Sequence, residues 1–190
     1  MDKMYDCIFL DRDGTINIDP GYISDVKNFN FYDYAFDALQ VLSNISKKFI
    51  IITNQSGVSR GIIKKNKLIE INKFIYKNFA ENNINLLNIY FCTDHPKKTT
   101  ARRKPGVGMF LEASNDFSIE LSNCLMIGDA SSDILPAFKL GMDSMLVLSG
   151  KGKTDIESFD ENFKPNYIAE NLLTGARELV TWKLQLFMGV

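Results

Sequence analysis

The sequence predicts an α/β protein in which helices cover a central, mostly parallel β-sheet. Short apolar runs with the composition of strands alternate along the chain with segments whose apolar residues recur at helical spacing. Several of these runs end in polar residues, where parallel sheets carry their functional groups. With 190 residues the chain is long enough for a substantial core, and we expect a single domain over residues 1–190.

Five apolar runs of five or six residues are the predicted strands. They contain few polar side chains before their last residues, which is typical of strands buried on both faces of a sheet. The predicted strands are Cys7–Asp11, Phe49–Asn54, Asn88–Cys92, Cys124–Asp129 and Ser144–Ser149.

The segments between and after these strands carry the apolar spacing of amphipathic helices. Asp33 is expected to cap the first helix, and Gly141 is expected to end the fourth. Pro136 fits the fourth helix if that helix begins near Ser132. The predicted helices are Tyr34–Lys48, Ile62–Asn82, Gly108–Phe117, Ser131–Leu140 and Leu172–Phe187.

Two connections are predicted to lie outside the helices and strands. Residues 15–32 contain Pro20-Gly21-Tyr22 and are too many for a simple strand-to-helix loop, so we expect a flap beside a functional site. The polar segment Gly150–Pro165 is expected to be a surface loop.

Composition excludes several classes of protein. A net charge of −1 gives no global attraction to nucleic acid or anionic membranes, and no apolar run approaches the length of a membrane span. We see no signal peptide at the N-terminus. Cys7, Cys92 and Cys124 lie far apart in the sequence, which favours a reducing compartment. We therefore expect a cytoplasmic protein, monomeric, without nucleic-acid or membrane partners.

The most informative segment is the end of the first predicted strand. Asp11 and Asp13 lie two residues apart, and Gly14 allows the chain to turn. Two crowded carboxylates are unfavourable unless a cation lies between them, and oxygen ligands suit Mg²⁺. An aspartate beside Mg²⁺ can also attack phosphorus and form an aspartyl phosphate. The alternative is an ordinary Asp-Gly turn after a strand.

Three further polar clusters follow later in the chain. Thr53-Asn54-Gln55-Ser56-Gly57 offers hydroxyl and amide groups to phosphate oxygens, although a common turn fits it too. Lys104, in a basic run before Pro105, can neutralise phosphate, whereas the alternative is a solvated basic loop. Asp129 ends a predicted strand. Asp133 can lie on the same side of the following helical turn as Asp129, and the alternative is that it only stabilises the start of the helix. With a divalent cation and a phosphate dianion, these charges nearly balance.

These four clusters, in this order, resemble the motifs of the haloacid dehalogenase superfamily of phosphatases. The longer segments Phe9–Asn17, Thr53–Gly61 and Arg103–Met109 resemble the branch that holds the heptose-bisphosphate and histidinol-phosphate phosphatases. The resemblance spans roughly residues 5–150. It implies a Rossmann-like three-layer sandwich with a minimal cap and a site open to small substrates.

The resemblance also implies a role for each matching residue. Asp11 is expected to be the nucleophile, and Asp13 the general acid and then the base. Thr53 and Lys104 are expected to hold the transferring phosphoryl group, and Asp133 to support the metal site and orient Lys104. The implied Mg²⁺ ligands are Asp11, Asp13 (through its backbone carbonyl) and Asp129. The implied substrate-binding residues are Asn54, Gln55 and Arg103.

One loop departs from the pattern of the branch, whose members often bind a structural zinc through Cys-x-His and Cys-x-Cys. Cys92 matches the first ligand, but Asp94 stands at the histidine position and His95 is offset by one residue. The second pair reads Thr100 and Arg102. Because tetrahedral zinc requires four nitrogen or sulfur ligands, we predict that structural zinc is absent.

The implied function is Mg²⁺-dependent removal of the 7-phosphate of D-glycero-D-manno-heptose 1,7-bisphosphate, a step toward nucleotide-activated heptose for surface polysaccharide. The alternative enzyme function is hydrolysis of histidinol phosphate. The basic run Arg102-Arg103-Lys104 favours an anionic sugar phosphate over that cationic amine. A non-catalytic sugar-phosphate-binding protein is expected to have lost Asp11 or Asp13, and a phosphomutase to need a larger cap.

Overall fold

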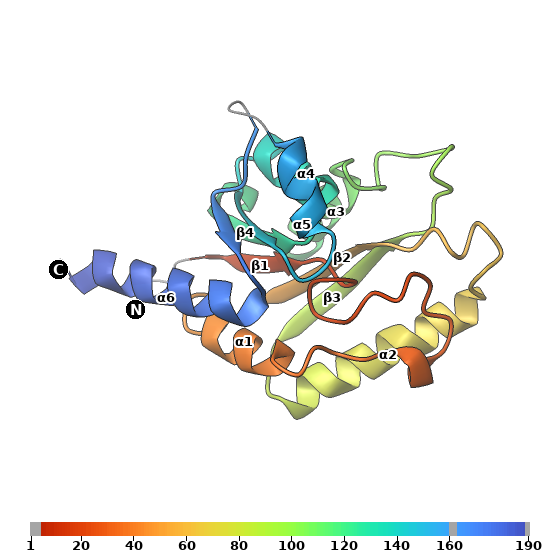
Figure 1. Ribbon diagram of the computed structural model, residues 1–190, viewed down its shortest axis with the longest axis horizontal. Helices are drawn as coiled ribbons and strands as arrows, with labels where there is room; N and C mark the ends of the chain where they lie inside the picture. The colour runs from red at the N-terminus through yellow and green to blue at the C-terminus, as the bar shows by residue number, and fades with distance from the viewer. Residues whose placement is uncertain (1–4, 160–162, 189–190) are drawn as a thin grey trace.

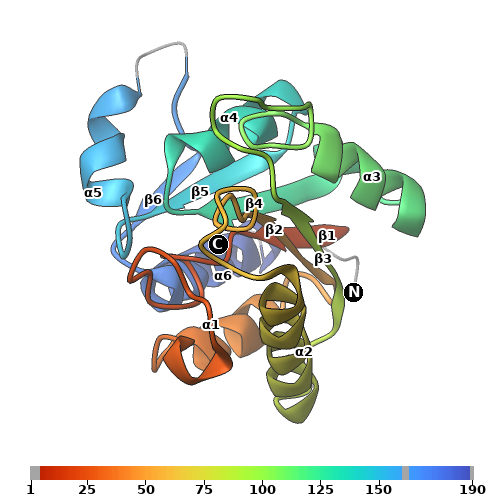
Figure 2. The ribbon, with the colours of Figure 1, turned by 90° about the vertical axis from the view of Figure 1, so that its right-hand side faces the viewer.

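The protein is built on one six-stranded parallel sheet with the strand order β3-β2-β1-β4-β5-β6 (Figures 1 and 2). The structure is a computed structural model and describes residues 5–159 and 163–188. The strands are β1 (Cys7–Leu10), β2 (Phe49–Asn54), β3 (Leu86–Cys92), β4 (Cys124–Gly128), β5 (Asp143–Val147) and β6 (Tyr167–Ala169).

Helices cover both faces of this sheet and complete a three-layer sandwich (Figures 1 and 2). Helices α1, α2 and α6 lie against one face, and α3 and α4 lie against the other. The α-helices are α1 (Ala35–Leu42), α2 (Lys65–Glu81), α3 (Gly108–Phe117), α4 (Ser131–Lys139), α5 (Gly152–Asp155) and α6 (Leu172–Met188). Short 3₁₀ turns span Val26–Asn28, Leu121–Asn123 and Ile156–Ser158.

Strand β2 shows why these strands are continuously hydrophobic in the sequence. Phe49 and Ile51 pack with α1, α2 and α6, whereas Ile50 and Ile52 pack with α3 and α4. All four side chains are buried. Each fully buried isoleucine contributes about 1.5–3 kcal/mol relative to an exposed one. The two-sided burial confirms the predicted α/β sandwich.

The strand order reverses at β1, and this reversal places the site. Strand β1 pairs with β2 on one side and with β4 on the other. Strands β2 and β3 therefore extend the sheet in one direction from β1, and β4, β5 and β6 extend it in the other. In open parallel sheets a crevice forms outside the carboxyl ends of the strands at such a switch point. The polar residues that follow β1, β2 and β4 therefore meet at one edge of the sheet.

Three predictions of local structure were wrong. The segment Gly150–Pro165 is not a plain loop, because it contains α5 and the turn Ile156–Ser158. Strand β6 was missed because it is only three residues long and leaves Ile168 about half exposed. Asp33 does not cap α1, whose N-cap position is Tyr34 and has no capping side-chain hydrogen bond.

The other elements agree with the prediction apart from their bounds. Helix α2 begins at Lys65 because the N–H groups of Ile62 and Ile63 both bond to the Gly57 carbonyl in a preceding turn. Gly141 follows α4 with a φ of 68°, a conformation that favours glycine after a helix. None of the helices in the described part of the chain has the length and apolarity to cross a membrane.

Candidate active site

A pocket of about 450 Å³ lies at the carboxyl edge of the sheet. Eight of the nine predicted site residues line it: Asp11, Asp13, Thr53, Asn54, Arg103, Lys104, Asp129 and Asp133. The ninth, Gln55, lies behind the pocket wall and is 5% exposed. Its amide Nε2 donates to both Thr53 Oγ1 (2.9 Å) and Asp13 Oδ2 (2.8 Å).

Lys104 links two of the predicted carboxylates at the floor of the pocket. Its Nζ lies 2.6 Å from Asp11 Oδ1 and 2.6 Å from Asp133 Oδ1, and it also donates to the Ile52 carbonyl (2.7 Å). The three donors of the ammonium group are thus all used. Burial by itself lowers the pKa of Lys104, but the two carboxylates outweigh burial and hold that pKa above its ordinary value.

Asp11, Asp129 and Asp133 form a compact carboxylate cluster. One oxygen from each lies within 4.8 Å of the others. Burial, with smaller contributions from the neighbouring carboxylates, raises the pKa of Asp11, and Lys104 opposes that rise. Burial and then Asp133 raise the pKa of Asp129 to about 6. Three buried carboxylates against one ammonium group leave excess negative charge, which suits a divalent cation.

The free oxygens of the cluster also suit a cation. Asp133 Oδ2 accepts the Ala130 N–H (3.1 Å), and Asp129 Oδ2 accepts the Lys151 N–H (2.7 Å). Asp11 Oδ2 and Asp129 Oδ1 accept no hydrogen bond from any described residue. The side chain of Asp13 lies outside this cluster, and the contact of its backbone carbonyl with the metal remains a prediction.

A segment after β5 that the sequence analysis treated as surface belongs to this site. A Cβ atom added at Gly150 would lie 2.0 Å from Asp129 Oδ2, and one at Gly14, whose φ is 85°, would lie 2.2 Å from it. Ser149 Oγ donates to the Gly14 carbonyl (2.7 Å) and joins the two turns. The signal was present, because Gly150-Lys151 follows the predicted strand Ser144–Ser149 as the other clusters follow theirs.

The residue Asn54 connects the end of β2 to the lysine loop. Its Nδ2 donates to the Lys104 carbonyl (3.0 Å), and its Oδ1 accepts the Lys104 N–H (3.1 Å). Both ends of the amide are therefore used in placing the Lys104 backbone. The predicted substrate contacts of Asn54 and Gln55 remain predictions.

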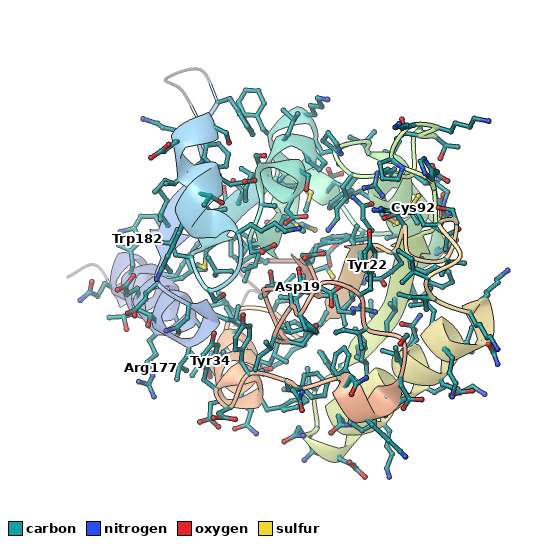
Figure 3. All side chains as sticks on the ribbon, turned by 45° about the vertical axis from the view of Figure 1, so that its right-hand side comes forward. Asp19, Tyr22, Tyr34, Cys92, Arg177 and Trp182 are labelled. Atoms are coloured by element: carbon teal, nitrogen blue, oxygen red, sulfur yellow. The ribbon has the colours of Figure 1, made fainter. Side chains whose placement is uncertain are left out.

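The mouth of the pocket carries cationic groups and the flap, residues 15–32. Arg60, Arg103 and Lys151 line the pocket. Asp19 and Tyr22 from the flap line it too, and Figure 3 labels both. The Arg60 guanidinium stacks on the Tyr22 ring, 5.4 Å from its centroid, and donates to its hydroxyl. The flap thus lies beside the pocket, as predicted. Arg60 was not identified from the sequence as a pocket residue.

In the loop matched to the zinc-binding segment, side chains bond to one another. Asp94 Oδ2 accepts both the N–H (2.6 Å) and the hydroxyl (2.7 Å) of Thr100. These hydrogen bonds lower the pKa of Asp94. Arg102 donates to the Phe91 carbonyl (3.1 Å) and pairs with Glu112. Hydrogen bonds therefore join Asp94 and Thr100, two of the positions matched to zinc ligands in the branch that the sequence resembles.

A second pocket, of about 350 Å³, lies between β6 and α6. It is lined mainly by apolar side chains, including Met145, Leu179 and Trp182, and shares no residue with the first pocket. Figure 3 shows Trp182 on the side of the molecule away from Tyr22 and Cys92. The chemistry-bearing residues therefore gather in the first pocket.

The chain is similar to known phosphatases. A family model described as HAD-hydrolase-like matches residues 101–175. A Vibrio cholerae protein is 35% identical over 156 residues, covering 78% of this chain and 84% of the relative. A Yersinia pestis protein is 34% identical over 162 residues, covering 81% and 86%. Both are named D-glycero-beta-D-manno-heptose-1,7-bisphosphate 7-phosphatase.

Solved structures share the fold. The D,D-heptose 1,7-bisphosphate phosphatase from B. bronchiseptica, complexed with magnesium and phosphate, superposes with a TM-score of 0.83. The match covers 93% of this chain and 99% of that chain at 24% sequence identity. At that identity the likeness shows the common fold.

Proposed function

The chain belongs to the haloacid dehalogenase-like phosphatases, enzymes that hydrolyse phosphoric monoesters, and we propose that it removes the 7-phosphate of D-glycero-β-D-manno-heptose 1,7-bisphosphate. The observation that carries this proposal is the match to enzymes of that name over about four fifths of the chain. The 1-phosphate is expected to remain, because a later nucleotidyltransferase would need it to activate the sugar.

The arrangement of the pocket supports a two-step reaction. A carboxylate oxygen of Asp11 attacks phosphorus, and the sugar oxygen leaves with a proton from Asp13. Water then attacks the aspartyl phosphate, Asp13 accepts the water proton, and inorganic phosphate leaves Asp11. Thr53 and Lys104 hold the phosphoryl oxygens during both steps, and Asp133 orients Lys104 through their 2.6 Å contact.

The carboxylate cluster fits the Mg²⁺ ion on which these phosphatases generally depend. Asp11 and Asp129 would hold it through the oxygens left free in the cluster, together with the backbone carbonyl of Asp13. Bound Mg²⁺ would supply positive charge that offsets the charge of the transferring phosphoryl group. We predict that no structural zinc is needed, because the loop around Asp94 is closed by hydrogen bonds.

Magnesium affinity is expected to fall with falling pH. In the metal-free protein Asp129 has a pKa of about 6, so it is ionised at pH 7 and mostly protonated at pH 5. A protonated carboxyl does not ligate Mg²⁺, so affinity is present above this pKa and lost below it. Calorimetric titration should show affinity about tenfold or more weaker at pH 5 than at pH 7, given that pKa of about 6.

An affinity that does not change between these pH values would contradict the assignment of Asp129. The control is protein stripped with EDTA, whose activity Mg²⁺ alone should restore. Elemental analysis of the same purified sample should show no stoichiometric zinc.

Arg103 is expected to bind the phosphate that is not transferred. It lines the pocket, and its guanidinium has only one hydrogen bond from the described residues, to the Asp94 carbonyl at 3.4 Å. Arg103→Ala should lower kcat/KM for the heptose bisphosphate by about one to two decades, because a charge-assisted contact is worth roughly 1.5–3 kcal/mol. Turnover of a small aryl phosphate should change little.

The matched control is the neighbouring Arg102→Ala. Arg102 pairs with Glu112 and does not line the pocket, so its replacement should leave both substrates nearly unaffected. Equal losses on both substrates in the Arg103 variant would mean that Arg103 serves the transferred phosphoryl group instead.

A further inference from the structure

Arg12 is a buried charge beside the active site for which the proposed chemistry gives no role. It is 1% exposed and is among the largest fully buried side chains of the described residues. Its guanidinium carbon lies 5.7 Å from the centroid of the Phe29 ring, and its Nη1 has no hydrogen-bond partner among the described residues. Burying a guanidinium without full hydrogen bonding is unfavourable, so the contacts it does make require an explanation.

All of the hydrogen bonds that this guanidinium donates to described residues go to Asp13. Oδ1 of Asp13 accepts from Arg12 Nε (3.0 Å) and Nη2 (2.9 Å), and also from Asn17 Nδ2 (3.0 Å). Oδ2 accepts from Arg12 Nη2 (2.8 Å) and from Gln55 Nε2 (2.8 Å). Because Gln55 Nε2 also donates to Thr53 Oγ1 (2.9 Å), Oδ2 is the oxygen on the Thr53 side.

The backbone of Arg12 is also held by hydrogen bonds. The Arg12 carbonyl accepts the N–H of Ile16 (3.0 Å) and, at longer range, that of Asn17 (3.3 Å), so a tight turn encloses the residue. Arg12 therefore binds the Asp13 side chain from the protein interior, and Asp13 itself lines the pocket. A planar guanidinium that contacts both oxygens fixes the orientation of a carboxylate as well as its position.

We propose that Arg12 is a positioning residue that holds Asp13 through both carboxylate oxygens, so that Oδ2, which accepts two hydrogen bonds where Oδ1 accepts three, is the oxygen that exchanges the proton. The inference rests on the proposed function, in which the proton on Oδ2 passes to the sugar oxygen as its bond to phosphorus breaks and the bond from Asp11 to phosphorus forms. In the second step Oδ2 takes a proton from the attacking water as the bond between Asp11 and phosphorus breaks. General acids need such placement to within about half an ångström.

The test compares two leaving groups in single-turnover experiments with Arg12→Lys. This variant keeps the positive charge but loses the planar guanidinium that contacts both oxygens of Asp13. The sugar oxygen of the heptose bisphosphate would be a strongly basic alkoxide without a proton and so needs the acid, whereas the phenolate of 2,4-dinitrophenyl phosphate does not. Release from the bisphosphate should slow by about 100-fold, and release from the aryl phosphate should stay within about twofold of wild type. The KM for the bisphosphate should not change.

Several controls keep the test decisive. Retained release from the aryl phosphate shows that the variant is folded. If Arg12→Lys does not fold, Asn17→Ala, which removes another donor to Oδ1, should show the same dependence on the leaving group with a smaller loss. Arg102→Lys, which alters an arginine–carboxylate pair outside the pocket, should change neither rate.

Equal slowing with both substrates, or a raised KM with unchanged release, would overturn the positioning role of Arg12. Asp13→Asn, measured in parallel, separates this outcome from failure of the proposed function. If Asp13→Asn shows no dependence on the leaving group, the acid role itself is wrong. If Asp13→Asn shows it and both the Arg12 and Asn17 variants do not, only the present inference fails.

Discussion

Replacing Asp11 with asparagine should abolish nearly all turnover while leaving the fold intact. The change keeps the shape of the side chain but removes the negative oxygen that attacks phosphorus, and with it the covalent route. We expect kcat to fall by more than about 10³-fold, because no second residue can replace a covalent nucleophile. The fall should be the same with sugar and aryl phosphates, since both routes begin with this attack.

The fold should survive this change because Lys104 keeps a second carboxylate partner. Its Nζ lies 2.6 Å from Asp133 Oδ1 as well as from Asp11 Oδ1. Circular dichroism and thermal unfolding should therefore resemble those of the wild type. Mass spectrometry must exclude deamidation of the new asparagine, and appreciable turnover after that control would show that Asp11 is not the nucleophile.

Replacing Asp13 with asparagine should slow both chemical steps by about 10²–10⁴-fold, the range typical of general acid–base catalysis. The leaving oxygen then receives no proton, and the attacking water gives none up. Rapid-quench measurements should resolve the slowing of each step. Magnesium affinity should change little, because the backbone carbonyl of residue 13 is unaltered.

Unlike the Asp11 change, this one should also lower stability. The new amide nitrogen is a donor placed among donors from Arg12 and Gln55, and the buried guanidinium loses its carboxylate partner. A loss of roughly 1–3 kcal/mol is expected for buried groups left unsatisfied in this way. Loss of magnesium binding in Asp13→Asn but not in Asp129→Asn would show that the two roles are assigned wrongly.

The sequence was sufficient to predict that the candidate catalytic groups meet. Asp11 and Lys104 are 93 positions apart, yet Lys104 Nζ contacts Asp11 Oδ1 at 2.6 Å. This could be expected because polar clusters at the ends of parallel strands share one edge of a sheet. Asp129 could be placed beside Asp11 by the same argument, and the register of β1 with β4 confirms that placement.

Other features depend on tertiary contacts that no local pattern reports. Arginine is rarely found fully buried, and the burial of Arg12 depends on Asp13 and the Phe29 ring. The Gln55 amide could face the pocket or its wall, and only the position of Asp13 decides between them. The approach of Gly150 to Asp129 depends on how the chain leaves β5. Edge strand β6 is not buried on both faces, so it lacks the continuous apolar run by which a strand is recognised in a sequence.

The most direct test of the account is to follow D-glycero-β-D-manno-heptose 1,7-bisphosphate by phosphorus NMR in the presence of the purified protein and Mg²⁺. Histidinol phosphate is compared in a parallel phosphate-release assay. We predict that the 7-phosphate signal disappears, that the 1-phosphate signal remains, and that kcat/KM for this substrate exceeds that for histidinol phosphate. Loss of the 1-phosphate, or a clear preference for histidinol phosphate, would contradict the account.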